Sequence, residues 1–235
     1  MDTINLLDLS YDHLFESRKT LPWWPWVGSQ FGVSPVKTMV LGESVYEWDS
    51  LRGAAASRYA QTTGLRITHN NHALSFGRDT PYVRNIERAI FSALTPADDQ
   101  KLSLWTSVAY HNLVLELLPS NGHRPSDSQF RAGWHETLDL CEQLQIEQCL
   151  VYGVESADAL RAVAAERNLA CSVRRIGAKV GGCYPRHGVL ESGDRQLKLL
   201  FVRHPSKFFS WRRWSPVIRS NLTFEFVVQA AEAPS

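Results

Sequence analysis

Short apolar runs divide the chain into segments that are typical of buried β-strands. These runs lie at 36–41, 104–112, 148–153 and 197–203. Each is shorter than an average helix and leads into glycine, proline or polar residues. We therefore expect four strands that are buried in a mainly parallel sheet.

Between these runs, apolar residues recur every three or four positions, as on the buried face of a helix. Pro81 stands at the first position of a helix expected to continue to about residue 93. Ser126 and Gln129 form a capping box at the start of a second helix. Two more helices are expected, at 157–164 and from about 210, the latter interrupted at Pro216.

The rest of the chain has weaker patterns. Residues 50–79 form a long polar segment without a clear period, which predicts a loop. A hairpin is expected over 181–200, with Gly193 and Asp194 at its turn. Other expected features are a short helix or arm at 1–20, a tryptophan-rich segment along the edge of the core at 22–28, and edge strands at 171–175 and 222–228.

Strands that alternate with helices indicate a three-layer α/β/α sandwich with a mainly parallel four-stranded central sheet. The 235 residues include 44% apolar side chains, which is enough for a full core. Because no Gly/Ser-rich or Pro-rich linker divides the chain, we expect one domain over 1–235. Residues 1–20 would be its N-terminal arm, and 222–235 its C-terminal edge or tail.

Composition narrows the classes of protein further. The four cysteines lie far apart and form no metal or disulfide pattern, so Cys141 and Cys149 are expected to be buried thiols. His69 and His72 lack a carboxylate or cysteine at matched spacing, and no metal or other cofactor is expected. The apolar runs are too short to cross a bilayer, and the N-terminus has no apolar signal region. These patterns predict a soluble, cytoplasmic, monomeric protein without a membrane partner.

Three of the expected strands end in side chains that are able to do chemistry. Glu43 follows the first strand through Gly42, Asn112 ends the second, and His204 ends the last. Open α/β sheets bind ligands at the carboxyl ends of their parallel strands. Each residue also has a purely structural interpretation, with Glu43 capping a turn and Asn112 satisfying backbone groups. Their convergence at one edge favours a functional site.

A basic segment follows the last strand. Five basic residues and no acidic residue lie between Arg203 and Arg219, although the whole chain has a net charge of only +1. Positive charge concentrated in this way is typical of a phosphate-binding surface. The alternative is an amphipathic helix in which Trp211 and Trp214 pack inward and the arginines are solvated.

The turn His204-Pro205-Ser206, followed by Lys207 and Phe208, resembles the His-Pro-Ser loop of the uracil-DNA glycosylase superfamily. Gly42-Glu43-Ser44-Val45-Tyr46 resembles the first motif of that superfamily, in which an aromatic residue follows a strand, a glycine and polar residues. The resemblance extends from about residue 22 to 219. It implies a uracil-DNA glycosylase-like sandwich without an iron–sulfur cluster.

The resemblance also implies roles for individual residues. Glu43 would orient water or stabilise the sugar cation, and Asn112 would read the edge of the base. Tyr46 would stack on the base or gate its pocket, and His204 would support the leaving base. Ser44 stands where the best-known branch has aspartate, a departure from typical uracil enzymes, and it is assigned to the base pocket. The expected DNA contacts are Ser206, Lys207, Arg212 and Arg213, with Phe208 as the intercalating wedge.

These roles predict a metal-independent DNA glycosylase, which flips a pyrimidine nucleotide and hydrolyses its N-glycosidic bond. The substrate would be uracil, in base-excision repair, or a modified cytosine. His72 and its polar neighbours in 50–79 would suit a larger, even glycosylated, base of phage DNA, and hence antiphage defence. Two rival hypotheses are a catalytically silent DNA-binding module of the same fold and a hydrolase that uses Ser44. The hydrolase hypothesis is disfavoured because the sequence Gly42-Glu43-Ser44-Val45-Tyr46 lacks the glycine that follows the serine in a nucleophile elbow.

Overall fold

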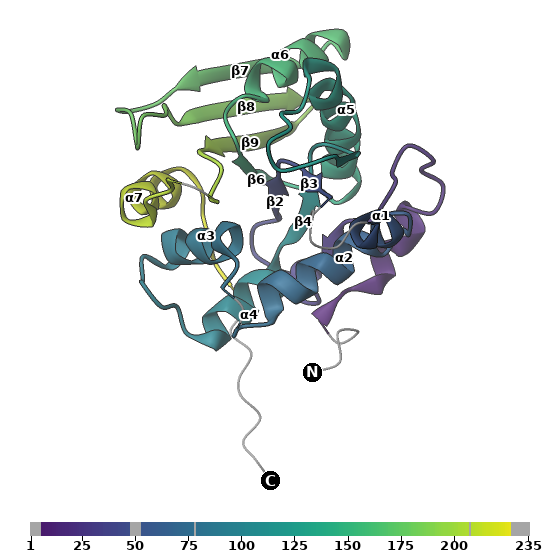
Figure 1. Cartoon of the computed structure of the whole chain (residues 1–235). Coiled ribbons are helices and arrows are strands. Elements are labelled where there is room, and N and C mark those ends of the chain that lie inside the picture. Colours follow the sequence, from purple (N-terminus) through teal and green to yellow (C-terminus); the bar gives the residue numbers. More distant parts are fainter. Residues whose placement is uncertain (1–5, 48–52, 78, 207, 227–235) are drawn as a thin grey trace.

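A seven-stranded mixed sheet forms the centre of the protein (Figure 1). The computed structural model describes residues 6–47, 53–77, 79–206 and 208–226. The strand order is β1-β4-β2-β6-β9-β8-β7. In chain order these strands are β1 (Trp26–Val27), β2 (Thr38–Gly42), β4 (Ala109–Asn112), β6 (Gln148–Tyr152), β7 (Ala170–Arg175), β8 (Arg186–Ser192) and β9 (Arg195–Val202).

The four adjacent strands β4, β2, β6 and β9 run parallel to one another. Gly42 pairs with Asn112 and Tyr152 with Val202, so all four strands end at the same edge. The prediction of a four-stranded sheet is wrong because three antiparallel strands extend it. β1 pairs with β4, while β8 and β7 continue the sheet beyond β9.

Helices cover both faces of the sheet and make the expected three layers (Figure 1). On one face, Met39, Leu41 and Phe201 pack in a core with Trp134 of α5 and Leu160 of α6. The intervening strand residues face a second core with α3, α4 and α7. The helix bounds are α1 (Ala54–Tyr59), α2 (Gly64–His69), α3 (Pro81–Phe91), α4 (Asp98–Ser107), α5 (Asp127–Gln143), α6 (Ala157–Glu166) and α7 (Trp211–Asn221).

Several sequence predictions are confirmed. Pro81 begins α3, and the Ser126–Gln129 capping box begins α5. The turn at Gly193 joins β8 and β9, and Ala170–Arg175 is an edge strand. Cys141 and Cys149 are buried free thiols, and Trp23 and Trp26 are buried at the edge of the core.

Other predictions are wrong. The segment 50–79, predicted as a loop, contains α1, α2 and a π-helix at Asn70–Leu74. The segment 104–112, predicted as a strand, is helical through Ser107 because Leu104 and Trp105 pack inward from α4.

Two predictions near the C-terminus are also wrong. Pro216 lies within α7 instead of interrupting it, since Trp214 and Ile218 anchor the helix on either side of the proline. Residues 222–226 form no strand, and Phe226 packs on Phe91 instead. Residues 227–228 of that expected strand lie outside the described part of the chain.

Two 3-10 helices and a two-stranded sheet complete the described structure. A 3-10 helix, Leu9–Leu14, lies in the N-terminal segment, and Phe31–Val33 forms another. β3 (Val45–Tyr46) pairs in parallel with β5 (Leu117–Leu118) just beyond the ends of β2 and β4. No helix among the described residues has both the length and the apolar character needed to cross a bilayer.

Candidate functional site

The three predicted residues lie at one edge of the sheet, where the parallel strands end. Asn112 is the last residue of β4, Glu43 directly follows β2, and His204 lies two residues beyond β9. The pairing of β2 with β4 continues past the strand ends, because Val114 donates its N–H to the carbonyl of Glu43 at 2.9 Å. The edge is therefore ordered by backbone hydrogen bonds up to the site.

Glu43 is buried at the centre of this edge, with only 3% of the residue exposed. One carboxylate oxygen lies against Gly153, at the end of β6, where a Cβ atom would stand 2.5 Å from Oε2. Gly153 has a φ of +86° and donates its N–H to the carbonyl of Val202 at 2.9 Å. Gly153 therefore contacts the Glu43 carboxylate and is also hydrogen-bonded to the last residue of β9, the strand that precedes His204.

Arg124 lies beside Glu43 and was not recognised in the sequence. Its Nη1 is 3.4 Å from Glu43 Oε1, and its Nη2 donates to Glu155 at 2.6 Å. Burial raises the pKa of Glu43, while the guanidinium opposes this change. Arg124 comes from the loop before α5 and Glu155 from the turn after β6, so only the fold brings them to the site.

Asn112 is held by its neighbours in β4 and β2. The Tyr110 hydroxyl donates to Asn112 Oδ1 at 3.0 Å, and the carboxamide lies over Gly42, where a Cβ would stand 2.2 Å from Oδ1. A side chain at position 42 would displace this carboxamide. The glycine that ends β2 is therefore needed for the close approach of Asn112.

His204 is held by the turn that follows it. The backbone N–H of Ser206 donates to His204 Nδ1 at 3.3 Å, and the Ser206 hydroxyl lies 2.9 Å from the same atom. Because Nδ1 accepts from a backbone donor, the neutral ring carries its proton on Nε2. Tyr152 packs edge-to-face on the imidazole, with 6.0 Å between ring centroids. Burial lowers the pKa of His204 to about 4, and the positive charge of Arg124 contributes.

Ser44 and Tyr46 lie next to Glu43 on β3 and the residues before it. The Ser44 hydroxyl donates to the Tyr46 hydroxyl at 2.7 Å. Burial raises the pKa of Tyr46, so the phenol stays protonated and is a poor base for activating Ser44. Glu47 accepts the N–H of Ala56 at the start of α1, which is a structural role.

His72 lies on the π-helix, on the face of the sheet that is covered by α3. Its Nδ1 is 2.5 Å from the hydroxyl of Tyr82 on α3. His69, one turn earlier, stacks on Tyr110 and is fully enclosed by aromatic rings, with both ring nitrogens unpartnered. His69 therefore packs on Tyr110, which is hydrogen-bonded to Asn112, whereas His72 contacts Tyr82 of α3.

The loop after His204 presents an exposed aromatic side chain. Phe208 is 83% exposed and has a φ of +55°, a left-handed conformation that is uncommon for phenylalanine. Asn85 of α3 donates to the carbonyl of Pro205 at 2.7 Å and fixes the base of the loop. Ser206 is exposed, and Lys207 lies outside the described residues. Such exposure means that Phe208 is not part of the hydrophobic core.

Arg212 and Arg213 are exposed on the first turn of α7. The Arg212 guanidinium lies over the Trp211 ring, 4.6 Å from its centroid. Trp214 is fully buried and stacks on Phe209, so the helix is anchored while its arginines face solvent. The amphipathic interpretation is therefore confirmed for Trp214 and the two arginines, and phosphate binding by these arginines stays a prediction.

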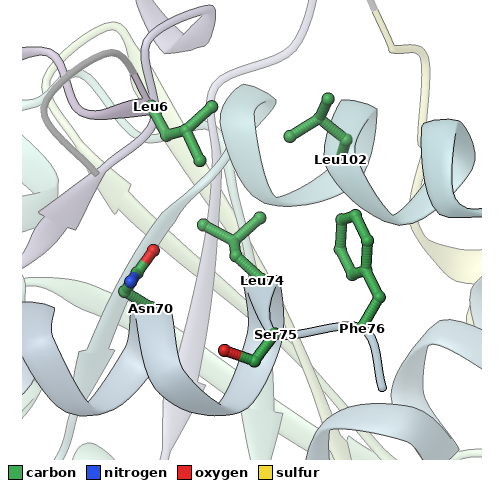
Figure 2. A pocket seen from close by; sticks show the side chains of 6 residues that line it. All are labelled: Leu6, Asn70, Leu74, Ser75, Phe76 and Leu102. Carbon is green, nitrogen blue, oxygen red and sulfur yellow. The ribbon is translucent and has the colours of Figure 1, made fainter. Parts of the chain in front are cut away.

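The pockets described in the structure lie away from these residues. Figure 2 shows one that is lined by Leu6, Asn70, Leu74, Ser75, Phe76 and Leu102. A second shares Phe76 and continues to Lys101. None of the predicted site residues lines either pocket. Within the described ranges, no group of three or more His, Cys, Asp or Glu side chains is placed to hold a metal ion.

The low pKa of His204 gives a testable dependence of stability on pH. Since the pKa is about 4 in the folded chain and 6.5 ordinarily, the unfolded chain binds more protons between these values. This contribution to stability is fully present above pH 6.5 and is lost as the pH falls toward 4. We expect His204→Gln to gain stability relative to the unsubstituted chain between pH 7 and 4.5, measured by urea unfolding. The exposed His123→Gln is the control. If the difference in free energy of unfolding between His204→Gln and the unsubstituted chain is the same at pH 7 and pH 4.5, the low pKa of His204 is contradicted.

In comparisons with known proteins, no protein-family model matches the chain, and no curated protein sequence matches it.

Proposed function

We propose that the protein is a DNA glycosylase that hydrolyses the N-glycosidic bond of a flipped pyrimidine nucleotide. The observation that carries the proposal is that Glu43 and His204 follow strands that end at the same edge of the sheet, with Gly153 and Arg124 against the Glu43 carboxylate. A buried carboxylate, a neutral imidazole and a carboxamide then lie at neighbouring strand ends. The resemblance of both flanking motifs to the uracil-DNA glycosylase superfamily supports the same reaction.

Glu43 is suited to the sugar side of the reaction. As the C1′–N bond breaks, positive charge develops on the sugar, and a nearby carboxylate stabilises it and orients the attacking water. Burial strengthens such an interaction because few waters screen it. Arg124 contacts one carboxylate oxygen and opposes the rise in the pKa of Glu43 that burial causes.

His204 is suited to the leaving base. Negative charge develops on the base carbonyl in the transition state, and a fixed hydrogen-bond donor stabilises it. The tautomer set by Ser206 places the proton on Nε2, which can donate as a neutral imidazole. With a pKa of about 4, the ring stays neutral at physiological pH and needs no prior protonation.

Asn112 and Tyr46 complete the proposed base pocket. The Asn112 carboxamide, with Oδ1 held by Tyr110, offers a fixed polar edge to the Watson–Crick face of a flipped base. Tyr46 is half-buried beside Glu43 and Arg124, where its ring could lie against the base. Ser44, hydrogen-bonded to Tyr46, would position that ring.

Phe208 is proposed to fill the gap that the flipped nucleotide leaves in the duplex. An exposed apolar side chain on a fixed loop next to His204 is placed for this role. We expect Phe208→Ala to lower excision from duplex DNA about tenfold or more, with a smaller loss on single-stranded DNA, which has no stack to fill. Abasic-site formation on both substrates is the measurement. Val33→Ala, another exposed apolar residue, is the control, and an equal loss on both substrates would contradict the wedge role.

The substrate is proposed to be uracil or a modified cytosine. Ser44 stands where typical uracil enzymes have aspartate, and His72 with its polar neighbours lies near α3. Both features favour testing a base larger than uracil alongside uracil itself. The test is to incubate the protein with duplexes containing uracil, a thymine mismatch, or glucosylated hydroxymethylcytosine, and to measure abasic sites. Abasic sites in the uracil duplex alone would support a repair role. Abasic sites in the modified duplex alone would support antiphage defence.

A second candidate is a DNA-binding module that has kept this fold without catalysis. The basic, exposed start of α7 and the exposed Phe208 favour it independently of Glu43. This candidate predicts salt-sensitive DNA binding without abasic sites in any of the duplexes above. The Ser44 hydrolase is disfavoured by the Ser44–Tyr46 hydrogen bond, which supplies no general base.

A further inference from the structure

The loop between β7 and β8 lies at the same edge of the sheet as His204. β7 ends at Arg175, which pairs with Arg186 at the start of β8, and Arg186 pairs in turn with Phe201 near the end of β9. The loop, residues 176–185, therefore projects from the edge that carries the candidate site. Figure 1 shows it on the same side of the molecule as α7.

This loop contacts the loop that bears Phe208. Arg203 Nη1 donates to the carbonyl of Gly181 at 2.6 Å, and the Arg203 guanidinium lies 5.6 Å from the centroid of the Phe208 ring. A Cβ at Gly181 would stand 3.6 Å from the carbonyl oxygen of Phe208. The two loops thus form one continuous surface around the exposed phenylalanine.

The surface carries positive charge that is only partly paired. Residues 167–190 include five basic and no acidic side chains, and two of the five, Arg167 and Arg186, pair with aspartates from elsewhere in the chain. Arg175 and Lys179 are exposed, and both cations lie over the ring of Tyr184, 5.0 and 5.3 Å from its centroid. The tyrosine holds the two positive charges close together despite their repulsion.

Some other exposed arginines of the protein are paired with carboxylates. Arg131 pairs with Asp127, and Arg161 pairs with Asp158. Within the described ranges, no carboxylate lies within 4.0 Å of the charged groups of Arg175, Lys179 or Arg203. An ordinary solvated face would be expected to mix both signs of charge, whereas a phosphate-binding surface carries one.

We propose that the β7–β8 loop, through Arg175 and Lys179, binds backbone phosphates of duplex DNA next to the base step that Phe208 enters. Arg203 lies between the loop and Phe208, on the segment that leads from β9 to α7. The proposal extends the proposed function, because it names the second part of the protein that holds the DNA. It concerns binding, and it does not require that the bound DNA be cleaved.

The experiment measures binding of a fluorescein-labelled 20-base-pair duplex of unmodified DNA over a series of NaCl concentrations. We expect Arg175→Gln/Lys179→Gln to weaken binding roughly tenfold at low salt and to reduce the slope of log K against log[salt] by about 2. The matched control is Arg195→Gln/Lys198→Gln, which removes the same charge from exposed residues of β9, with Arg195 at the β8–β9 turn and Lys198 in the middle of the strand. The control should leave both quantities nearly unchanged.

Three results would overturn the proposal: no binding of the duplex by the unsubstituted protein, an unchanged slope in the loop variant, or an equal loss in the control. The last would indicate an effect of net charge alone. Failure of the proposed function is read separately, from the abasic-site assay. A protein that binds with the expected slope difference but forms no abasic sites would retain the phosphate-binding surface and lose the glycosylase assignment.

Discussion

Replacing Glu43 with glutamine is expected to lower abasic-site formation by about 10³-fold, within the range of about 10²–10⁴ for loss of an acid–base group. Glutamine keeps the size of the side chain and removes its charge. Because Glu43 is buried and burial raises its pKa, removing the charge also removes a cost of folding. The free energy of unfolding should therefore stay the same or increase. Single-turnover rates on the preferred duplex, together with urea unfolding, measure both quantities.

Glu155→Gln is the matched control for this substitution. Glu155 also bonds to Arg124, but it is exposed, and exposed ion pairs contribute little to stability. We expect the rate to change by less than about tenfold, since Arg124 keeps its contact with Glu43. If Glu43→Gln retains full activity, or if both substitutions reduce the rate alike, Glu43 is a structural residue of the turn after β2.

The elements that could be predicted from the sequence are those whose pattern is decided locally. β2 and β6 are continuous apolar runs, which parallel strands require because both faces are buried. The start of α5 depends on a side-chain cap within four residues. The number of strands could not be predicted in the same way, because β1 has two residues and β7 has mostly exposed side chains.

The helices of 50–79 were missed for a physical reason. α1 and α2 have six residues each, so neither is long enough to show a helical period. Their burial also depends on distant partners. Arg66 is buried in α2 because it pairs with Asp12 at 2.6 Å and donates to the carbonyl of Pro25. A buried arginine makes the segment look polar in the sequence.

Some residues of the candidate site could likewise be placed from the sequence, and others could not. The placement of Glu43, Asn112 and His204 at one edge could be predicted because parallel strands end at a common edge. Arg124 and Glu155 could not, since they come from a loop and a turn whose positions depend on packing between α5 and α6. The sequence pattern indicates Gly153 only as the end of a strand. In the structure, the absence of a side chain at Gly153 makes room for the Glu43 carboxylate.

Gly153→Ala is expected to lower the rate of base excision about 10²-fold, since a displacement of about 1 Å in a catalytic group can have this effect. The new Cβ would stand 2.5 Å from Glu43 Oε2, so the carboxylate must move. It is the end of a flexible side chain, so the movement itself costs little stability. The φ of +86° adds a backbone cost of about 1–2 kcal/mol for any L-residue.

Gly193→Ala separates these two effects. Gly193 has a φ of +60° in the β8–β9 turn, and nothing lies within 4 Å of its Cβ position. Both alanine variants should therefore lose a similar free energy of unfolding, about 1–2 kcal/mol, while only Gly153→Ala loses activity. Urea unfolding and single-turnover excision provide the comparison. Equal rates in the two variants would mean that the position of the Glu43 carboxylate does not matter for the reaction, and Glu43 would then lose its assigned role.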